Sequence, residues 1–359
     1  MKFPSTMRAI VAYGKNDYRL VRDFPTPECG EEDIIIKTAA CGICASDLKC
    51  QQGAAMYWGD EKRSMVVHPP FIPGHEFYGT IVSVGKKVEG FEVGELVVPE
   101  QIVPCGKCRF CHNGQYWMCQ TPARIFGFHE TLNGGMAEYV KLPKGTRLYR
   151  IPEGLSMEKA LLIEPYSCSK HCIDRAEITS EDIVVISGAG ALGLGMVTYA
   201  HMLNPKMLIS LDMIPERLEM AKKFGADIVM NPSEVNVTEE ILKMTDGYGC
   251  DIYIEATGHP SSVLQGMDMI RKLGRFVEFG VFGQNVTLDW SIISDRKELD
   301  IRGVHLSPNS FEFVIDNITN GNLKTDGVVS SVYPIEEMET AFYNASGKDG
   351  NLKVGICFE

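Results

Sequence analysis

The feature that most restricts the possible folds is a glycine-rich segment between an apolar run of strand length and a helical pattern. Ile183–Ser187 is the apolar run, and Gly188, Gly190 and Gly193 follow it in the spacing Gly-x-Gly-x-x-Gly. In this context glycines permit a tight turn, close approach of the backbone to a pyrophosphate, and close packing of helix on strand. Unpaired N–H groups at the helix start would then face the phosphates. We therefore expect a dinucleotide site at Gly188, Gly190, Leu192 and Gly193.

The pattern of strands and helices changes along the chain. Residues 7–150 contain short β-segments separated by Gly and Pro, which is typical of a partly open, antiparallel β-barrel. From about residue 165, apolar strands alternate with helical patterns such as Pro215–Phe224, which predicts an α/β fold with a doubly wound parallel sheet. Short strand-like pieces return after residue 300. We expect two domains: a β-rich domain from residues 1–164 and 301–359, and an α/β nucleotide-binding domain from residues 165–300.

The composition excludes several classes of protein. Of the 359 residues, 45% are hydrophobic and 23% are charged, which is the balance of a folded chain. The formal net charge of −12 argues against nucleic-acid or anionic-membrane partners, since both need a basic face. No apolar run is long enough for a transmembrane helix, and the first residues lack the apolar core of a signal peptide. We therefore expect a cytoplasmic protein.

A carboxylate follows the next strand at the distance expected for a ribose contact. Asp212 lies nineteen residues after Gly193, where it can accept both ribose hydroxyls of NAD and repel the additional phosphate of NADP. No basic residue follows at once, so the sequence favours NAD; the alternative is a solvated aspartate at a strand end. Further candidates for cofactor contact are Arg217, near the adenine side, and Thr257 and Val281, in stretches that could equally be plain turns.

Four of the twelve cysteines form a cluster with the spacing C-x2-C-x2-C-x7-C: Cys105, Cys108, Cys111 and Cys119. Four thiolates complete a tetrahedral zinc site without an open position, so this site would be structural. An iron–sulfur cluster is one alternative, but the chain has no further cluster chemistry. Disulfides are the other, and the lack of an export signal disfavours them.

A second group of residues indicates an open metal site. Cys44 and the adjacent pair His75 and Glu76 combine a thiol, an imidazole and a carboxylate, and an unpaired carboxylate buried in an apolar stretch would be costly. A zinc ion held by these residues, with one position left for water or substrate, would remove that cost. Glu164, before Pro165 at the expected domain junction, is the fourth candidate and could equally cap a helix. Taken singly, Cys44 is more often a buried thiol and His75 a structural histidine.

Together these motifs resemble those of the zinc-containing alcohol dehydrogenases in the medium-chain dehydrogenase/reductase superfamily. The stretch Gly74–Val88 is similar to the zinc motif of that superfamily. The Cys44 segment, the four-cysteine cluster, residues 134–139 and the glycine fingerprint occur in the family's order along essentially the whole chain. The resemblance implies a GroES-like β-barrel catalytic domain, an NAD-binding Rossmann domain, a catalytic and a structural zinc ion in each subunit, and a homotetramer.

Within the superfamily the chain is similar to the polyol branch, of which sorbitol dehydrogenase is typical. The resemblance implies that Cys44, His75 and Glu76 hold the catalytic zinc and that Glu164 binds it directly or through water. It also implies that zinc lowers the pKa of the substrate hydroxyl and that Ser46 takes the proton. The carboxylate of Asp47 would orient His75. Many relatives carry a histidine where Lys49 stands, so the proton path beyond Ser46 stays open.

Three segments further resemble bacterial dehydrogenases that act on erythritol and threitol: residues 115–119, 164–171 and 289–293. Leu306 stands where sorbitol dehydrogenases use an arginine, which argues against sorbitol itself. We therefore expect oxidation of a secondary hydroxyl of a short polyol to a ketose, with NAD as the hydride acceptor. An aldose or L-threonine dehydrogenase is the alternative within the superfamily. A zinc- and nucleotide-binding protein without turnover is disfavoured, because the ligands, Ser46 and the glycine fingerprint are all present.

The substrate pocket would include the loop Gly53–Pro73, which carries Tyr57 and Trp58. This loop could equally lie at the surface and contact another subunit. Phe128, His129 and His305 are further candidates for contact with the substrate, although a histidine at a strand end is more often structural.

Overall fold

The computed structural model of the protein describes residues 4–121, 124–347 and 350–358, and the chain divides into two compact units. The β-rich unit comprises the described residues up to Glu164, Phe311–Thr319, and the described residues from Thr325 onward. The α/β unit comprises Pro165–Ser310 and Asn320–Lys324. Residues 301–310 lie in the α/β unit and not, as the sequence predicts, in the β-rich one, because β13 (Asp300–Gly303) pairs with β12 (Ile270–Glu278).

The β-rich unit contains a small antiparallel sheet and a larger sheet. Its strands are β1 (Thr6–Gly14), β2 (Asp17–Pro25), β3 (Ile34–Ile43), β4 (Glu76–Val84), β5 (Leu96–Pro99), β6 (Tyr139–Leu142), β7 (Leu148–Arg150), β14 (Val329–Pro334) and β15 (Lys353–Cys357). β1 and β2 pair with each other, and the larger sheet has the order β14-β15-β3-β4-β5-β7 with β6 paired to β3. β14 and β15 run parallel, and the other pairs in this sheet are antiparallel. A strand from the end of the chain therefore completes a sheet that the first half begins.

Apolar side chains from these strands form one core. Ile10 of β1, Ile36 of β3 and Phe77 of β4 are buried in it, and burying a side chain of this size contributes about 1.5–3 kcal/mol. The helices α1 (Ala45–Gln51), α2 (Ala55–Trp58) and α11 (Met338–Ala345) and the 3-10 turn η3 (Ile335–Glu337) pack on this core. The unit also contains α3 (Arg109–His112), α4 (Met157–Ala160), α10 (Phe311–Thr319) and the 3-10 turn η1 (Tyr116–Met118).

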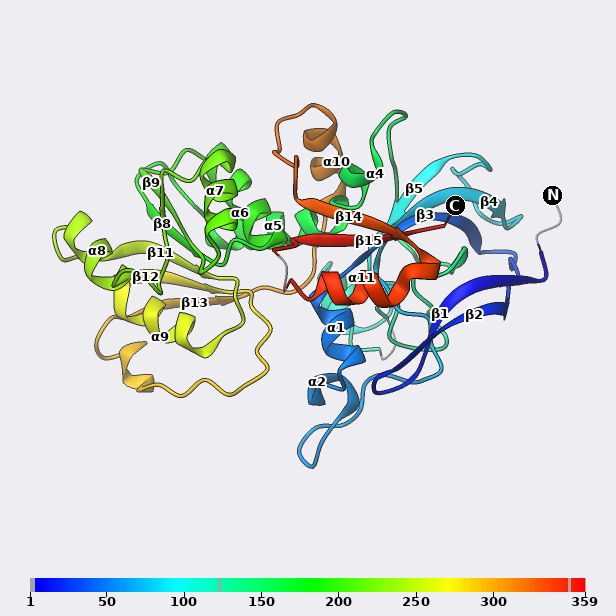
Figure 1. Ribbon diagram of the computed structural model, residues 1–359, viewed down its shortest axis with the longest axis horizontal. Coiled ribbons are helices and arrows are strands. Elements are labelled where there is room, and N and C mark those ends of the chain that lie inside the picture. Colours follow the sequence, from blue (N-terminus) through cyan, green and yellow to red (C-terminus); the bar gives the residue numbers. More distant parts are fainter. Residues whose placement is uncertain (1–3, 122–123, 348–349, 359) are drawn as a thin grey trace. The chain divides into compact units, whose positions relative to one another are not determined.

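The α/β unit contains a parallel sheet with helices on both faces. Its remaining strands are β8 (Ile183–Ser187), β9 (Met207–Leu211), β10 (Ile228–Met230) and β11 (Cys250–Glu255), and the order is β10-β9-β8-β11-β12-β13. Its helices are α5 (Ile163–Ala176), which begins in the β-rich unit, α6 (Ala191–Met202), α7 (Pro215–Phe224), α8 (Val237–Met244) and α9 (Pro260–Met269), with the 3-10 turn η2 (Trp290–Ile292). Figure 1 shows α6 and α7 on one side of these strands and α9 on the other.

The central strand β8 is buried along its whole length, because helices cover both faces of the sheet, and this explains its unbroken apolar sequence. The expected strand Ile183–Ser187 and the expected helix Pro215–Phe224 are both found. None of the helices in the described part of the chain combines the length and apolar character needed to cross a lipid bilayer.

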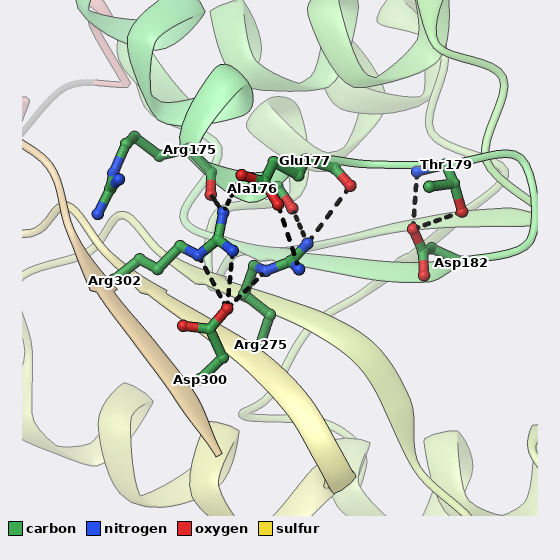
Figure 2. A network of polar contacts seen from close by, with 8 residues as sticks. All are labelled: Arg175, Ala176, Glu177, Thr179, Asp182, Arg275, Asp300 and Arg302. Atoms are coloured by element: carbon green, nitrogen blue, oxygen red, sulfur yellow. Dashed lines mark hydrogen bonds and ion pairs between the residues drawn. The ribbon is translucent and has the colours of Figure 1, made fainter.

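A network of ion pairs holds the end of α5 against the sheet of the α/β unit (Figure 2). Arg275 of β12 donates to the carbonyl oxygen of Ala176 at 2.6 Å, and Arg302 of β13 donates to that of Arg175 at 2.9 Å. Both guanidinium groups also contact Asp300, at 3.1 and 2.9 Å. The last carbonyl groups of a helix have no partner within the helix, and cations are favourable there. The two arginines therefore satisfy the end of α5 and fix it to two adjacent strands.

We predict that Arg275→Met lowers the free energy of unfolding of the protein by about 2 kcal/mol, because hydrogen bonds from a charged group are lost at a half-buried helix end. Arg19→Met is the control: Arg19 and Asp17 form an exposed pair, and its loss should change stability by less than about 0.5 kcal/mol. Urea unfolding of both variants measures the difference. Equal stabilities would contradict the role of the network.

Candidate metal centres and nucleotide site

The four predicted cysteines lie together in the β-rich unit, around α3 and η1. Their sulfur atoms are within 4.8 Å of one another; the Cys105–Cys111 distance is 3.9 Å and the Cys108–Cys111 distance is 3.5 Å. Sulfur atoms around a tetrahedral zinc ion lie about 3.8 Å apart. The backbone N–H of Cys108 donates to Cys105 Sγ at 3.3 Å, which places a fixed dipole against a thiolate. All four cysteines are free thiols, so the geometry fits a zinc ion and not disulfides.

The thiols of this cluster do not ionise alike in the absence of a cation. A hydrogen bond from the Thr121 side chain, followed by the backbone N–H of Lys107, lowers the pKa of Cys105 to about 5. Burial, followed by the thiol of Cys108, raises the pKa of Cys111 to about 12. Zinc binds thiolates, so a zinc ion at this cluster would favour the deprotonated form of Cys111 as well as that of Cys105.

The predicted open site is also assembled within the β-rich unit. Cys44 is the N-cap of α1, directly after β3, and His75 immediately precedes β4, whose first residue is Glu76. β3 and β4 are antiparallel and Gly42 pairs with Glu76, so the end of one strand meets the start of the other. One ligand atom from each of Cys44, His75 and Glu76 lies within 4.8 Å of the others. A Cβ atom at position 42 would overlap the Glu76 carboxylate, so glycine there makes room for it.

Glu76 has a charged partner that sequence reasoning missed. Lys353 Nζ of β15 lies 2.7 Å from one carboxylate oxygen of Glu76 and 2.6 Å from the other, and both residues are buried. The premise that Glu76 is unpaired is therefore wrong, while its contact with a metal stays a prediction. Burial alone would lower the pKa of Lys353, but the charge of Glu76, followed by that of Cys44, raises it above its ordinary value. A lysine in the apolar strand Lys353–Cys357 was the available signal.

The other predicted residues of the open site lie close by. Glu164 is buried in the first turn of α5, and its charge acts on His75 and Lys353, but it is not part of the cluster of candidate ligand atoms. Asp47 accepts a hydrogen bond from the Cys44 N–H at 2.9 Å. Its other oxygen is 3.8 Å from His75 Nδ1, too long for a hydrogen bond.

Three buried polar atoms at this site have no hydrogen-bond partner among the described residues: His75 Nδ1, Asp47 Oδ1 and Ser46 Oγ. Buried polar groups are nearly always satisfied, so such a concentration indicates a site for a ligand. The thiol, imidazole and carboxylate form a donor set that zinc accepts. The residues present therefore fit a zinc ion with a position open to substrate.

Two of the predicted pocket residues lie beside this site. The ring of Phe128 is 5.7 Å from that of His75, and Tyr57 stacks on Phe128 at 5.3 Å. Trp58 instead donates its indole N–H to the Cys50 carbonyl oxygen at 2.7 Å, which holds the loop in place. The side chain of His129, which follows Phe128, pairs with His68, and His305 belongs to the α/β unit. Contact of any of the five with substrate stays a prediction.

The glycine fingerprint has the geometry that its spacing predicts. Gly188 follows β8 with φ = 104°, a conformation that side chains disfavour, and a Cβ atom at Gly193 would overlap the Gly188 carbonyl oxygen. A Cβ atom at Gly190 would meet nothing within 4 Å, which leaves open space in front of the first turn of α6. Leu192 accepts a hydrogen bond from Ser169 at its carbonyl oxygen, at 2.8 Å. The helix start therefore fits a dinucleotide phosphate.

Asp212 follows β9, as predicted, and it also braces the glycine loop. Its carboxylate accepts hydrogen bonds from the backbone N–H groups of Ala189, at 2.8 Å, and Ile214, at 2.9 Å. Arg217 lies in the first turn of α7. The ribose contact of Asp212 and the adenine contact of Arg217 stay predictions.

Two glutamates occupy neighbouring strand ends in the α/β unit. Glu255 ends β11 and is fully buried, and it accepts hydrogen bonds from the N–H groups of Thr257, at 2.9 Å, and Gly258, at 3.2 Å. Thr257 is thus tied to its own strand, whereas Val281 beyond β12 is exposed. Glu278, in register with Glu255, has an oxygen without a hydrogen-bond partner among the described residues. Burial, followed by the charge of Glu255, raises the pKa of Glu278 to about 8.

Comparisons with known proteins agree with this arrangement. Residues 30–153 match the family model described as alcohol dehydrogenase GroES-like domain, and residues 191–320 match the model described as zinc-binding dehydrogenase. The chain is 44% identical over 357 residues to the erythritol/L-threitol dehydrogenase of Mycolicibacterium smegmatis, with 98% of each chain covered. It belongs to the zinc-containing alcohol dehydrogenases.

Other zinc-containing alcohol dehydrogenases match nearly as completely. The sorbitol dehydrogenase of Bacillus subtilis is 32% identical over 355 residues, with 98% of each chain covered. The L-threonine 3-dehydrogenase of Pyrococcus horikoshii is 34% identical, with 92% of each covered. A solved structure of an alcohol dehydrogenase (rspB) of E. coli CFT073 with NADH superposes with a TM-score of 0.86, at 29% identity over 99% of this chain and 100% of that one. The predicted family and its GroES-like and Rossmann folds are confirmed.

We predict that Lys353→Met lowers the free energy of unfolding of this dehydrogenase by about 3 kcal/mol, because it leaves the Glu76 carboxylate buried without a partner. The double variant Lys353→Met/Glu76→Gln should recover most of the loss, since neither charge is then present. Urea unfolding of the proteins in the presence of a chelator tests this, because no zinc ion at the open site can then take the place of Lys353 or depend on Glu76. An equal loss in the single and double variants would show that the two charges are not coupled.

We predict that Glu278 makes the dehydrogenase less stable as pH rises. Its pKa in the native state is about 8, against an ordinary value of 4.5, so the native state keeps a proton that the unfolded chain releases within this range. Stability from this group is full below pH 4.5 and is lost as pH approaches 8. In Glu278→Gln the free energy of unfolding should fall by about 1 kcal/mol less over this pH range than in wild type. The expected difference is small because the side chain is partly exposed to solvent.

Thermal unfolding at several pH values from 5 to 8.5 measures this contribution. Glu219→Gln, at an exposed position on α7, is the control and should follow the wild-type curve. A Glu278→Gln variant that loses stability with pH as steeply as wild type would contradict the prediction.

Proposed function

We propose that this dehydrogenase oxidises a secondary hydroxyl of a four-carbon polyol, of the erythritol or threitol type, to a ketose, with NAD as the hydride acceptor. The observation that carries the proposal is the open Cys44, His75 and Glu76 cluster, in a chain 44% identical to an erythritol/L-threitol dehydrogenase. The similarity to a sorbitol dehydrogenase supports a polyol as substrate class.

In this proposal each residue of the open site has a separate role in binding zinc or substrate. When bound, zinc acts as a Lewis acid toward the substrate hydroxyl and NAD accepts the hydride. Cys44 and His75 hold the zinc ion, and Glu76 and Glu164 add negative charge at the same place, as ligands or through water. Lys353 balances the charge of Glu76, which keeps that carboxylate in a buried position.

Ser46 takes the proton that the substrate hydroxyl releases. Its Oγ atom is buried and interacts with the side chain of Tyr57, which lies beside the open site. The paired rings of Tyr57 and Phe128 beside His75 keep water from the reacting carbon and select a small substrate. Lys49 stands where many relatives carry a histidine, so the proton leaves Ser46 through ribose hydroxyls or water.

The proposal extends to cofactor, compartment and assembly. A carboxylate at Asp212 beside the glycine loop favours NAD over NADP, because it repels a phosphate on the ribose. The twelve cysteines are all free thiols, which agrees with the cytoplasm. By likeness to its family the subunit forms a homotetramer. No nucleic-acid or membrane partner is proposed, in keeping with the net charge of −12.

We predict that the purified, zinc-loaded enzyme reduces NAD with erythritol or threitol and that Cys44→Ser lowers kcat/KM by at least about a thousandfold with the fold retained. A panel of tetritols, pentitols, sorbitol, aldoses and L-threonine, assayed with NAD, ranks the substrates. The control is Cys29→Ser, at a half-buried thiol outside both zinc sites, which should keep wild-type activity. Higher kcat/KM for L-threonine or an aldose than for any polyol would overturn the proposed substrate class.

We predict that Asp212→Ala raises the KM for NAD about tenfold and reduces the preference for NAD over NADP, because one carboxylate then neither accepts ribose hydroxyls nor repels a phosphate. Asp212→Asn separates these effects in part, since it keeps one acceptor oxygen and the size of the side chain but removes the negative charge that would repel a phosphate. Steady-state kinetics with both cofactors tests this. An unchanged cofactor preference in both variants would exclude the ribose contact.

A further inference from the structure

A third group of metal-ligating side chains lies in the β-rich unit, separate from the two zinc sites. It consists of His68, His129 and Glu130, and one ligand atom from each lies within 4.8 Å of the others. None of these residues belongs to the four-cysteine cluster or to the Cys44, His75 and Glu76 cluster. None of these three residues has a role in the proposed reaction.

The backbone holds the two histidines together. Residues 68 and 129 form a parallel β-bridge, and the N–H of His68 donates to the carbonyl oxygen of Phe128 at 3.2 Å. The imidazole rings are 4.4 Å apart, and His129 Nδ1 is 2.9 Å from the Glu130 carboxylate. The hydroxyl of Thr131 lies 3.0 Å from the same nitrogen, Nδ1. Thr131 therefore makes no contact with the other ring nitrogen, Nε2. The chain therefore brings two imidazoles and a carboxylate to one place by main-chain pairing.

We propose that His68, His129 and Glu130 form a third metal site, which binds a divalent transition-metal ion of the zinc class. Imidazole and carboxylate ligands suit such ions, and a set of two histidines and one carboxylate leaves positions for water. Ligand atoms around a tetrahedral zinc ion lie about 3.4 Å apart. All three candidate ligand atoms lie within 4.8 Å of one another, and His68 is exposed and therefore free to rotate toward the ion.

An ion at this site would join the two segments that carry the aromatic pair beside His75. His129 directly follows Phe128, which stacks on Tyr57. On the other side, the N–H groups of Val66 and Val67 donate to the Tyr57 carbonyl oxygen, at 2.9 and 3.3 Å, immediately before His68. A bound ion would thus connect the segment that carries Tyr57 to the segment that carries Phe128. This site differs from the Cys44, His75 and Glu76 site in its exposure, since His68 and Glu130 are exposed and His129 is half-buried.

Zinc binding to the full-length enzyme tests the proposal. Enzyme with both other zinc sites filled is dialysed against a several-fold excess of zinc, and bound zinc per chain is counted by elemental analysis. Wild type should bind one zinc ion more than His129→Gln and His68→Gln. His201→Gln removes an exposed histidine of α6 in the α/β unit and is the control, which should match wild type. Equal zinc contents in wild type, His68→Gln and His129→Gln would overturn the proposal.

Glu130→Gln tests the third ligand. It keeps both imidazoles and should weaken binding of the additional zinc ion about tenfold in a competition titration with a chromophoric chelator. Unchanged affinity would remove Glu130 from the ligand set. Because bound metal and not turnover is measured, the result does not depend on the proposed substrate.

Discussion

The open metal site depends on the buried ion pair between Glu76 and Lys353. Each charge alone would be costly to bury, and removing one partner of such a pair usually destabilises a protein more than removing both. Glu76 adjoins the candidate ligand His75, and Lys353 comes from the last strand of the chain. The carboxylate can therefore stay beside the metal site only when β15 has joined the sheet next to β3. This contact ties the chemistry of the site to completion of the fold.

The surrounding charges explain why such a partner is needed. Cys44, Asp47, Glu76 and Glu164 place a thiol and three carboxyl groups around one histidine, and the three carboxyl groups are buried. Burial, the largest influence, raises the pKa of Asp47 above its ordinary value. One lysine and one divalent cation are the charges that balance this excess of acids. The four-cysteine cluster follows the same principle with sulfur alone, since burial raises the pKa of Cys111 and a cation would favour its thiolate.

Features that depend on local spacing could be predicted from the sequence. The glycines around Gly188 and the four cysteines are each close in the chain, and both arrangements were found as their spacing indicates. Bringing Cys44 to His75 requires an antiparallel β3–β4 pair, which the family pattern implied. Lys353 could not be assigned, because its partner is 277 residues away and a single lysine in an apolar strand does not identify it. The β-bridge between His68 and His129 and the pairing of β13 with β12 also could not be predicted, because neither contact follows from the spacing of neighbouring residues.

The central claim is that the subunit holds zinc in two chemically different ways. X-ray absorption at the zinc edge, on enzyme prepared with two zinc ions per chain, tests this most directly. A site with four sulfur ligands and one with a single sulfur ligand should give about 2.5 sulfur neighbours per zinc ion on average, with nitrogen and oxygen making up the rest. An average of four would contradict the claim, because no zinc would then occupy the open site at Cys44 and His75.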